Sequence, residues 1–230
     1  MTHTPRDTRT ISMRRAAILE ELAGAAKAGG RGRAEVTLVA VSKLQPEARI
    51  EEALNAGQLV FGENRVQEAM TRWQHRRASY PDLELRLIGP LQSNKAEDAV
   101  GLFDVIETLD REKLARAILK AMEKTGRSPR LYVQVNTGEE PQKAGIAPKD
   151  VPAFVAEMRA LMPQGIEGLM CIPPVEEPAS LHFALLAKLA REAGVEKLSM
   201  GMSADYALAA RLGATSVRVG SGLFGEREGA

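Results

Sequence analysis

Lys43 stands at the end of a short apolar run, Leu38-Val39-Ala40-Val41-Ser42-Lys43, where a buried strand would finish. Val39, Val41 and Lys43 alternate along the run, so their side chains share one face of that strand. A lysine at this place has two interpretations. It reaches past the strand end to solvent, or it is a partly buried nucleophile that forms a Schiff base with an aldehyde. The second interpretation requires a ligand that carries an aldehyde.

A glycine-rich segment near the C-terminus offers a place for an anion. Residues 220–225 read GSGLFG and match the dinucleotide pattern G-x-G-x-x-G, but only five residues follow them. A dinucleotide fold needs a βαβ unit and a later acidic residue, for which there is no room. Glycines after a strand still let backbone N–H groups approach a phosphate. Ser203 follows the preceding strand and is a candidate phosphate ligand. It is also expected to cap a helix at 204–212, and the two roles are compatible because both use a helix N-terminus.

Arg218 is a second charge inside an apolar strand, Val217-Arg218-Val219. If the two valines face outer helices, the guanidinium points into the site and needs a partner, since an unpaired buried cation is costly. Glu63 is a candidate partner within the protein, and an acceptor on a ligand is the alternative. An aldehyde for Lys43, a phosphate for the glycines and an acceptor for Arg218 together describe pyridoxal 5′-phosphate.

The elements that must position these groups alternate between short apolar strands and longer helices. Strands are predicted at 38–42, 59–61, 85–88, 105–108, 131–136, 166–170, 197–200 and 216–219. Helices are predicted at 46–56, 65–77, 94–101, 111–124, 150–161, 180–193 and 204–212, with a leading helix at 8–28. Several of these helices are followed by glycine, the usual stop signal. Apolar strands that alternate with helices predict a parallel sheet covered on both faces.

About eight such units in 230 residues predict a single (β/α)8 TIM barrel over residues 1–230, with an extra N-terminal helix. An open doubly wound sheet is the structural alternative. In a (β/α)8 barrel the functional groups lie at the C-terminal ends of the strands. Nearly every predicted strand end carries a glycine or a hydrogen-bonding side chain: SK, FGEN, IGPLQSN, VNTG, MCIPP, MGMS and RVGSG.

Composition excludes several other classes of protein. The chain is 44% hydrophobic and 27% charged, enough for a sizeable core, and its net charge of +1 argues against a general nucleic-acid binder. No apolar run reaches the ~18 residues of a membrane span, and the N-terminus is too polar for a secretory signal. A single cysteine, Cys171, favours a reducing compartment. We therefore expect a soluble, cytoplasmic protein without a metal site, because the three histidines lack ligand spacing.

Seven motifs, in order along the chain, resemble those of the YggS/PROSC family of pyridoxal-phosphate-binding homeostasis proteins. They are VAVSKLQP, FGENRVQEA, LIGPLQSNKA, VNTGEEPQKAGI, GLMCIPP, LSMGMSADY and VRVGSGLFGE. The resemblance runs from about Arg14 to Arg227, nearly the whole chain. This family is similar to the N-terminal barrel of alanine racemase, so the resemblance implies a barrel like that domain.

The resemblance also implies which residues bind the cofactor. Carried over by position, these residues are Lys43, Asn64, Ser203, Arg218, Gly220 and Ser221. Lys43 corresponds to the Schiff-base lysine and Arg218 to an arginine that faces the cofactor. Ser221 stands where a threonine is expected, but both residues offer a hydroxyl. Lys143, in EPQKAG, matches a second family lysine whose role is open.

The expected role is that of a carrier and not of an enzyme. Racemization needs a base on each face of the cofactor, and in alanine racemase the second base is a tyrosine from a C-terminal domain, whereas this chain stops at Ala230. A cation near the ring nitrogen also weakens the ring as an electron sink. We expect a monomer, without catalytic residues, that serves intracellular vitamin B6 homeostasis and delivers the cofactor to apo-forms of pyridoxal phosphate enzymes. The alternatives are a low-activity, racemase-like enzyme and a Schiff-base aldolase.

Overall fold

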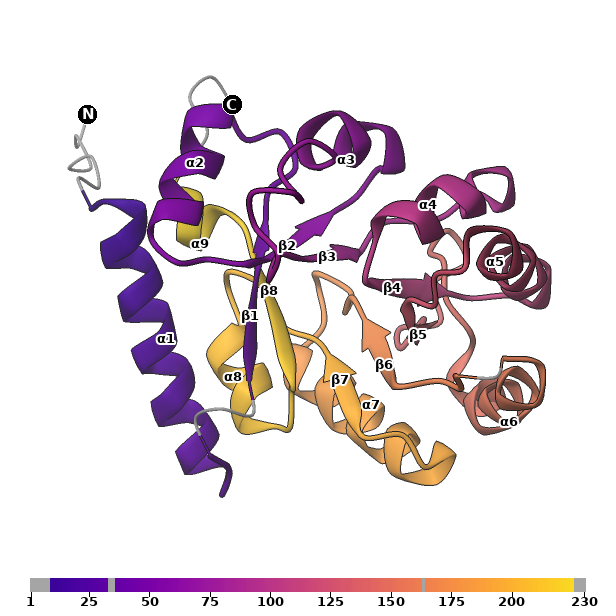
Figure 1. Cartoon of the computed structure of the whole chain (residues 1–230). Coiled ribbons are helices and arrows are strands. Elements are labelled where there is room, and N and C mark those ends of the chain that lie inside the picture. Colours follow the sequence, from indigo (N-terminus) through magenta and orange to yellow (C-terminus); the bar gives the residue numbers. More distant parts are fainter. Residues whose placement is uncertain (1–8, 33–35, 163, 226–230) are drawn as a thin grey trace.

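Eight parallel strands close into one barrel, in which each strand pairs with its sequence neighbour and β1 pairs with β8. The computed structural model describes residues 9–32, 36–162 and 164–225 (Figure 1). The strands are β1 (Thr37–Val41), β2 (Val60–Glu63), β3 (Glu84–Leu87), β4 (Val105–Leu109), β5 (Arg130–Val135), β6 (Gly168–Cys171), β7 (Lys197–Ser199) and β8 (Ser216–Val219). The predicted (β/α)8 barrel is confirmed, and the open-sheet alternative is wrong.

The helices follow the strands in the predicted alternation. They are α1 (Ile11–Ala28), α2 (Glu47–Asn55), α3 (Val66–Trp73), α4 (Ala96–Leu102), α5 (Glu112–Thr125), α6 (Val151–Leu161), α7 (Ala179–Ala193), α8 (Tyr206–Arg211) and α9 (Ser221–Phe224). α3 is shorter than predicted, because the chain turns after Trp73. The leading helix begins at Ile11 after Thr10, whose hydroxyl accepts from the Met13 N–H at 3.2 Å, and Thr8 lies outside the described residues. No helix in the described ranges is long and apolar enough to cross a membrane.

Strand residues alternate between the outer helices and the barrel interior. Outward residues such as Leu38, Phe61 and Val217 pack into the large core between strands and helices. Val39 lies inside, next to Gly62, where a Cβ would come within 3.0 Å of Val39 Cγ1 and 2.9 Å of Ile88 Cδ1. The interior is therefore narrow, and the period of two that the sequence shows decides which side chains enter it.

The leading helix α1 supports the elements that follow the last two strands. It lies outside the barrel and contacts α8, α9 and α2 (Figure 1). The Ile11 N–H donates to Glu52 Oε1 of α2 at 2.8 Å, and the Tyr206 hydroxyl of α8 donates to the Glu21 carboxylate. Leu22 of α1 is buried in the same core as the strands. α1 is thus part of the barrel's packing and not an appendage.

We expect Leu22→Ala to lower the free energy of unfolding by about 2–5 kcal/mol, because it opens a cavity beneath α1. Met13 lies on the same helix with 57% of its surface exposed, so Met13→Ala should change stability by less than about 0.5 kcal/mol. Urea unfolding followed by circular dichroism measures both. Equal effects of the two substitutions would show that α1 does not pack on the barrel as described.

Candidate functional site

One pocket at the C-terminal mouth of the barrel brings together all six residues that the sequence singled out. Its volume is about 260 Å³, slightly below the ~300 Å³ at which the usual range for small-molecule sites begins. Its lining comprises Val41, Lys43, Gln45, Asn64, Ile88, Ile172, Met202, Ser203, Arg218, Gly220, Ser221 and Gly225. These residues come from the ends of β1, β2, β3, β6, β7 and β8, so the pocket needs the closed barrel to form.

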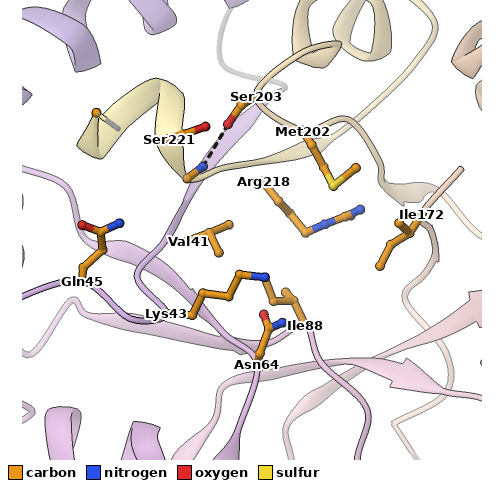
Figure 2. A pocket seen from close by; sticks show the side chains of 12 residues that line it. Val41, Lys43, Gln45, Asn64, Ile88, Ile172, Met202, Ser203, Arg218 and Ser221 are labelled. Carbon is orange, nitrogen blue, oxygen red and sulfur yellow. Dashed lines mark hydrogen bonds between the residues drawn. The ribbon is translucent and has the colours of Figure 1, made fainter. Parts of the chain in front are cut away.

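Lys43 follows β1 and reaches into this pocket. Figure 2 shows its side chain beside Ile88 and Asn64, with the guanidinium of Arg218 on the facing wall. Lys43 is half-buried, and among the described residues it has no carboxylate within ion-pair distance. The structure therefore favours a lysine directed at a ligand over one that extends to open solvent.

The loops after β7 and β8 meet at Ser203. The N–H groups of Gly220 and Gly222 both donate to Ser203 Oγ, at 3.2 and 3.3 Å (Figure 2 shows the first bond). A Cβ on Gly222 would lie 3.0 Å from Val219 Cγ1 and 3.6 Å from Ser203 Oγ, so a side chain there would crowd this group. Ser203, Gly220 and Gly222, hereafter the N–H cradle, present convergent donors of the kind that bind phosphate.

The expectation that Ser203 also caps the following helix is wrong. α8 begins at Tyr206 after Asp205, and Asp205 Oδ1 accepts from the Met202 N–H at 2.6 Å. Gly201 makes the preceding turn with φ of +91°, and a Cβ on it would lie 2.5 Å from Ala209 Cβ. This tight turn directs Ser203 toward β8 and away from the start of α8.

Arg218 is 3% exposed and points from β8 into the site. Its Nη1 donates to Ser199 Oγ at 2.6 Å, and its Nη2 donates to the carbonyl of Cys171 at 2.8 Å. The predicted orientation is confirmed, since Val217 and Val219 lie in the outer core. Two bonds to neutral acceptors fix the direction of the guanidinium but leave its charge without a direct carboxylate partner among the described residues.

Glu63 is not the partner of Arg218, contrary to one of the two expectations. It shares the outward face of β2 with Phe61, and its Oε1 accepts from Ser42 Oγ at 2.7 Å and from Trp73 Nε1 at 2.9 Å. The alternation along β2 sends Glu63 to the helix side of the sheet, so it never enters the barrel interior.

A buried polar network continues from Arg218 through the barrel interior. Ser199 Oγ donates to Glu107 Oε2 at 2.6 Å, and Arg86 Nη1 donates to Glu107 Oε1 at 3.1 Å. Burial by itself would lower the pKa of Arg86, but the carboxylates of Glu107 and Glu84 outweigh this effect and raise it. The Glu107 side chain therefore lies between two arginines, Arg86 directly and Arg218 through Ser199.

Six lining residues were not among the predicted site residues, namely Val41, Gln45, Ile88, Ile172, Met202 and Gly225. Ile172 and Met202 are partly exposed, at 37% and 38% of their surfaces. They form an apolar wall on the side of Arg218 (Figure 2). Ile88 lies two residues after the inward-facing Arg86, and Ile172 lies two residues after the inward-facing Met170. The period of two along each strand could therefore have predicted that both isoleucines face the pocket.

Comparison with known proteins gives the family. A family model described as alanine racemase, N-terminal domain, matches residues 19–228. The pyridoxal phosphate homeostasis protein of Pseudomonas aeruginosa is 40% identical over 227 residues, with 95% of this chain and 96% of that protein covered. Its Escherichia coli K12 counterpart is 34% identical over 222 residues, with 93% and 95% covered. This chain belongs to the pyridoxal phosphate homeostasis protein family.

Solved structures agree with this family assignment. PipY of Synechococcus elongatus PCC7942, solved with PLP bound, is 40% identical with a TM-score of 0.80, covering 94% of this chain and 100% of that one. An alanine racemase from Clostridium difficile is 17% identical with a TM-score of 0.67, covering 91% of this chain and 56% of the racemase. The racemase shares the barrel fold, whereas the homeostasis family shares both fold and sequence.

The tyrosines of this family member all lie away from the pocket. Tyr132 is inside the barrel but lines a different cavity, together with Arg86 and Arg130, and burial raises the pKa of its phenol. Burial and the hydrogen bond to Glu21 raise the pKa of Tyr206 to about 12. Tyr80 packs against the outer core. The described part of the chain therefore supplies no tyrosine to the mouth that holds Lys43.

Lys143 does not line the pocket either. It lies in the loop after β5, and its Nζ forms an ion pair with Glu140 Oε2 at 2.5 Å. Asn136 holds this loop, because its amide donates to the Glu140 carbonyl at 2.8 Å. Metal ligation is not supported, since the described residues contain no group of three or more His, Cys, Asp or Glu that could hold an ion.

We expect Ser199→Ala to lower the free energy of unfolding by about 1–3 kcal/mol, because it leaves Glu107 Oε2 and Arg218 Nη1 buried without this partner. The exposed hydroxyl of Thr71 donates only to a carbonyl of its own helix, so Thr71→Ala should have a far smaller effect. Denaturant unfolding of the protein without cofactor measures both. An unchanged stability of Ser199→Ala would contradict the network.

Proposed function

We propose that this protein binds pyridoxal 5′-phosphate in the pocket at the C-terminal mouth, holds it through Lys43 and hands it on in vitamin B6 homeostasis. The observation that carries the proposal is the convergence of Lys43, Arg218, Ser203 and Gly220 in the lining of one pocket, with the Gly222 N–H completing the N–H cradle behind Ser203. The relative at 40% identity with PLP bound supports it. The single buried cysteine, Cys171, fits the reducing, cytoplasmic compartment that we also propose.

The chemistry of the pocket fits the cofactor at both of its ends. The N–H cradle has two N–H groups already aimed at one oxygen, that of Ser203, which a phosphate oxygen can join or replace. The exposed hydroxyl of Ser221 adds a donor at the same end. At the other end, Lys43 Nζ bonds to the aldehyde carbon, and the aldehyde oxygen leaves as water.

The walls between these ends suit an aromatic ring. Ile172 and Met202 offer apolar contact on one side, and the Lys43 stem and Ile88 lie on the other (Figure 2). Asn64 follows β2 and provides an amide that can bond a polar ring substituent. The ring therefore packs between apolar side chains, and a small number of polar groups fix its orientation, as in most cofactor sites.

Arg218 favours binding over catalysis. The cofactor supplies an electron sink whose strength depends on a proton at the ring nitrogen, and a cation beside that nitrogen disfavours the proton. The bonds to Ser199 and Cys171 hold Arg218 in the pocket wall. With no tyrosine among the described lining residues to act as a second base, the site is built for retention and exchange. We propose a monomeric carrier whose transient partners are apo-forms of pyridoxal phosphate enzymes.

Borohydride reduction of the loaded protein should place a pyridoxyl group on Lys43, because this amine lies in the pocket with the N–H cradle. Peptide mass mapping locates the label, and loss of the visible absorbance reports the reduction. Lys43→Ala is the control and should lose both signals. A label confined to Lys95 or Lys143 would contradict the assignment, since neither lines the pocket.

The loaded protein should not exchange the α-proton of amino acids faster than free pyridoxal phosphate does, because the described lining of the pocket contains neither a tyrosine to act as a second base nor an acidic residue to pair with the ring nitrogen. Proton NMR of single-enantiomer amino acids in deuterated water follows this exchange. Faster exchange that disappears in Lys43→Ala would show that the protein is an enzyme. Transfer of cofactor to an apo-enzyme, measured by recovery of that enzyme's activity, is the positive counterpart.

A further inference from the structure

Lys43 lies in a tight turn that is strained. The Gln45 N–H donates to the Ser42 carbonyl at 3.1 Å, so Lys43 and Leu44 are the two central residues of a four-residue turn. Leu44 has φ of +59°, one of two non-glycine residues with positive φ among those described. A turn with positive φ only at its third residue normally takes glycine there. A leucine is unfavourable in this conformation, and it persists only where the surroundings hold it.

Arg72 of α3 supplies the contacts that hold this turn. Its Nη1 donates to the Ser42 carbonyl at 2.8 Å, and its Nη2 donates to the Gln45 carbonyl at 3.0 Å. One guanidinium thus bonds the first and the last residue of the turn that carries Lys43. Only a planar fork of donors can reach two carbonyls in this way.

Arg72 is itself fixed by carboxylates. Its Nη1 donates to Glu63 Oε1 at 2.9 Å, and its Nε donates to Glu47 Oε1 at 3.2 Å. Glu63 is fully buried, whereas Arg72 leaves 12% of its side chain exposed. Burial alone would lower the pKa of Arg72, but Glu63 and Glu47 raise it. The arginine is therefore a permanent cation with a fixed orientation.

Glu63 also joins the turn directly. Its Oε1 accepts from Ser42 Oγ at 2.7 Å and from Trp73 Nε1 at 2.9 Å, in addition to Arg72. Glu63, Arg72, Trp73 and Ser42 lie outside the pocket lining. They form a rigid support behind the strand end, on the side opposite the ligand.

We infer that Arg72 is a positioning residue that holds the strained Ser42–Gln45 turn and thereby aims Lys43 at the cofactor. The inference rests on the proposed role of Lys43. Without the arginine, Leu44 relaxes toward negative φ and the turn opens. Lys43 then loses its fixed direction. The entropy lost when its side chain is ordered is now part of the binding free energy, so the affinity for the cofactor falls.

The test compares Arg72→Gln with Arg65→Gln, a matched control near the start of the same helix. Arg65 is 78% exposed and pairs only with Glu68 among the described residues. The affinity for pyridoxal 5′-phosphate should fall roughly tenfold in Arg72→Gln and stay within about twofold of wild type in Arg65→Gln. The share of borohydride label on Lys43 should also fall in Arg72→Gln, with more label on other lysines.

Leu44→Gly separates a positioning role from a merely structural one. Glycine adopts positive φ without strain, so the turn no longer needs the arginine. Leu44→Gly in the Arg72→Gln background should recover at least roughly threefold of the lost affinity, whereas Leu44→Gly alone should bind within about twofold of wild type. Failure of glycine to restore any affinity would assign the loss to the packing of α3 and overturn the inference.

The same measurements distinguish failure of the inference about Arg72 from failure of the proposed function. If wild type carries no label on Lys43, the proposed function fails. If wild type is labelled there and Arg72→Gln binds equally tightly, only the role of Arg72 fails. Should Arg72→Gln not fold, Arg72→Lys keeps a cation beside Glu63 but lacks the planar fork. Its affinity should then fall about threefold, and wild-type affinity would overturn the inference.

Discussion

A cation inside a barrel of apolar strands is the constraint on which the site depends. Removing the guanidinium of Arg218 from water is costly unless its donors are bonded. Ser199 and the Cys171 carbonyl take two of them, and Ser199 passes the interaction to Glu107. Glu107 in turn needs Arg86, and Arg86 Nε donates to Glu84 Oε1 at 2.6 Å near the opposite mouth. The inward charge of Arg218 is therefore one end of a series of bonded arginine and glutamate side chains that extends through much of the barrel interior.

This interior is possible because the outer layer supplies the apolar packing. The large core lies between the strands and the helices, whereas the apolar cluster inside the barrel comprises Val105, Tyr132 and Met170 among the described residues. A polar interior forgoes hydrophobic burial, but its bonds fix side-chain directions that apolar packing would leave freer. The apolar layer between strands and helices thus contributes most of the hydrophobic stabilisation, whereas the polar side chains inside the barrel fix the orientation of the site residues.

Alternation along single strands allowed much of the fold and the pocket to be predicted from the sequence. The shared face of Val39, Val41 and Lys43, and the flanking of Arg218 by valines, needed only a period of two. The same rule, applied to Phe61 and Glu63, would have excluded Glu63 as the partner of Arg218. Glu63 was chosen as a candidate partner for Arg218 because of its opposite charge. The structure shows that the face of the strand on which a side chain lies determines whether the two can meet.

Contacts between distant segments could not be predicted in the same way. The series from Arg218 to Arg86 depends on which residues face each other across β3, β4, β7 and β8, and a one-residue change of register would remove it. Arg72 donates to backbone carbonyls about thirty positions earlier in the chain. Every residue has such a carbonyl, so the sequence does not indicate which of them an arginine will bond. Ser203 looked like a helix cap because a serine before a helical pattern usually is one, whereas Gly201 turns it toward β8.

The site lies where the first and the last strand of the barrel pair. β1 pairs with β8, with Val39 opposite Arg218 and Ala40 opposite Val219, so the Lys43 turn and the N–H cradle become neighbours only when the last strand closes the barrel. A ligand that contacts both binds the closed barrel and not the open chain. Binding of this kind adds RT ln(1 + [L]/Kd) to the free energy of unfolding, about 2.7 kcal/mol at a hundredfold excess over Kd. Loading with cofactor and closure of the barrel at the β1–β8 pairing are consequently coupled equilibria, so whatever strengthens binding of the cofactor also raises the free energy of unfolding of the loaded protein.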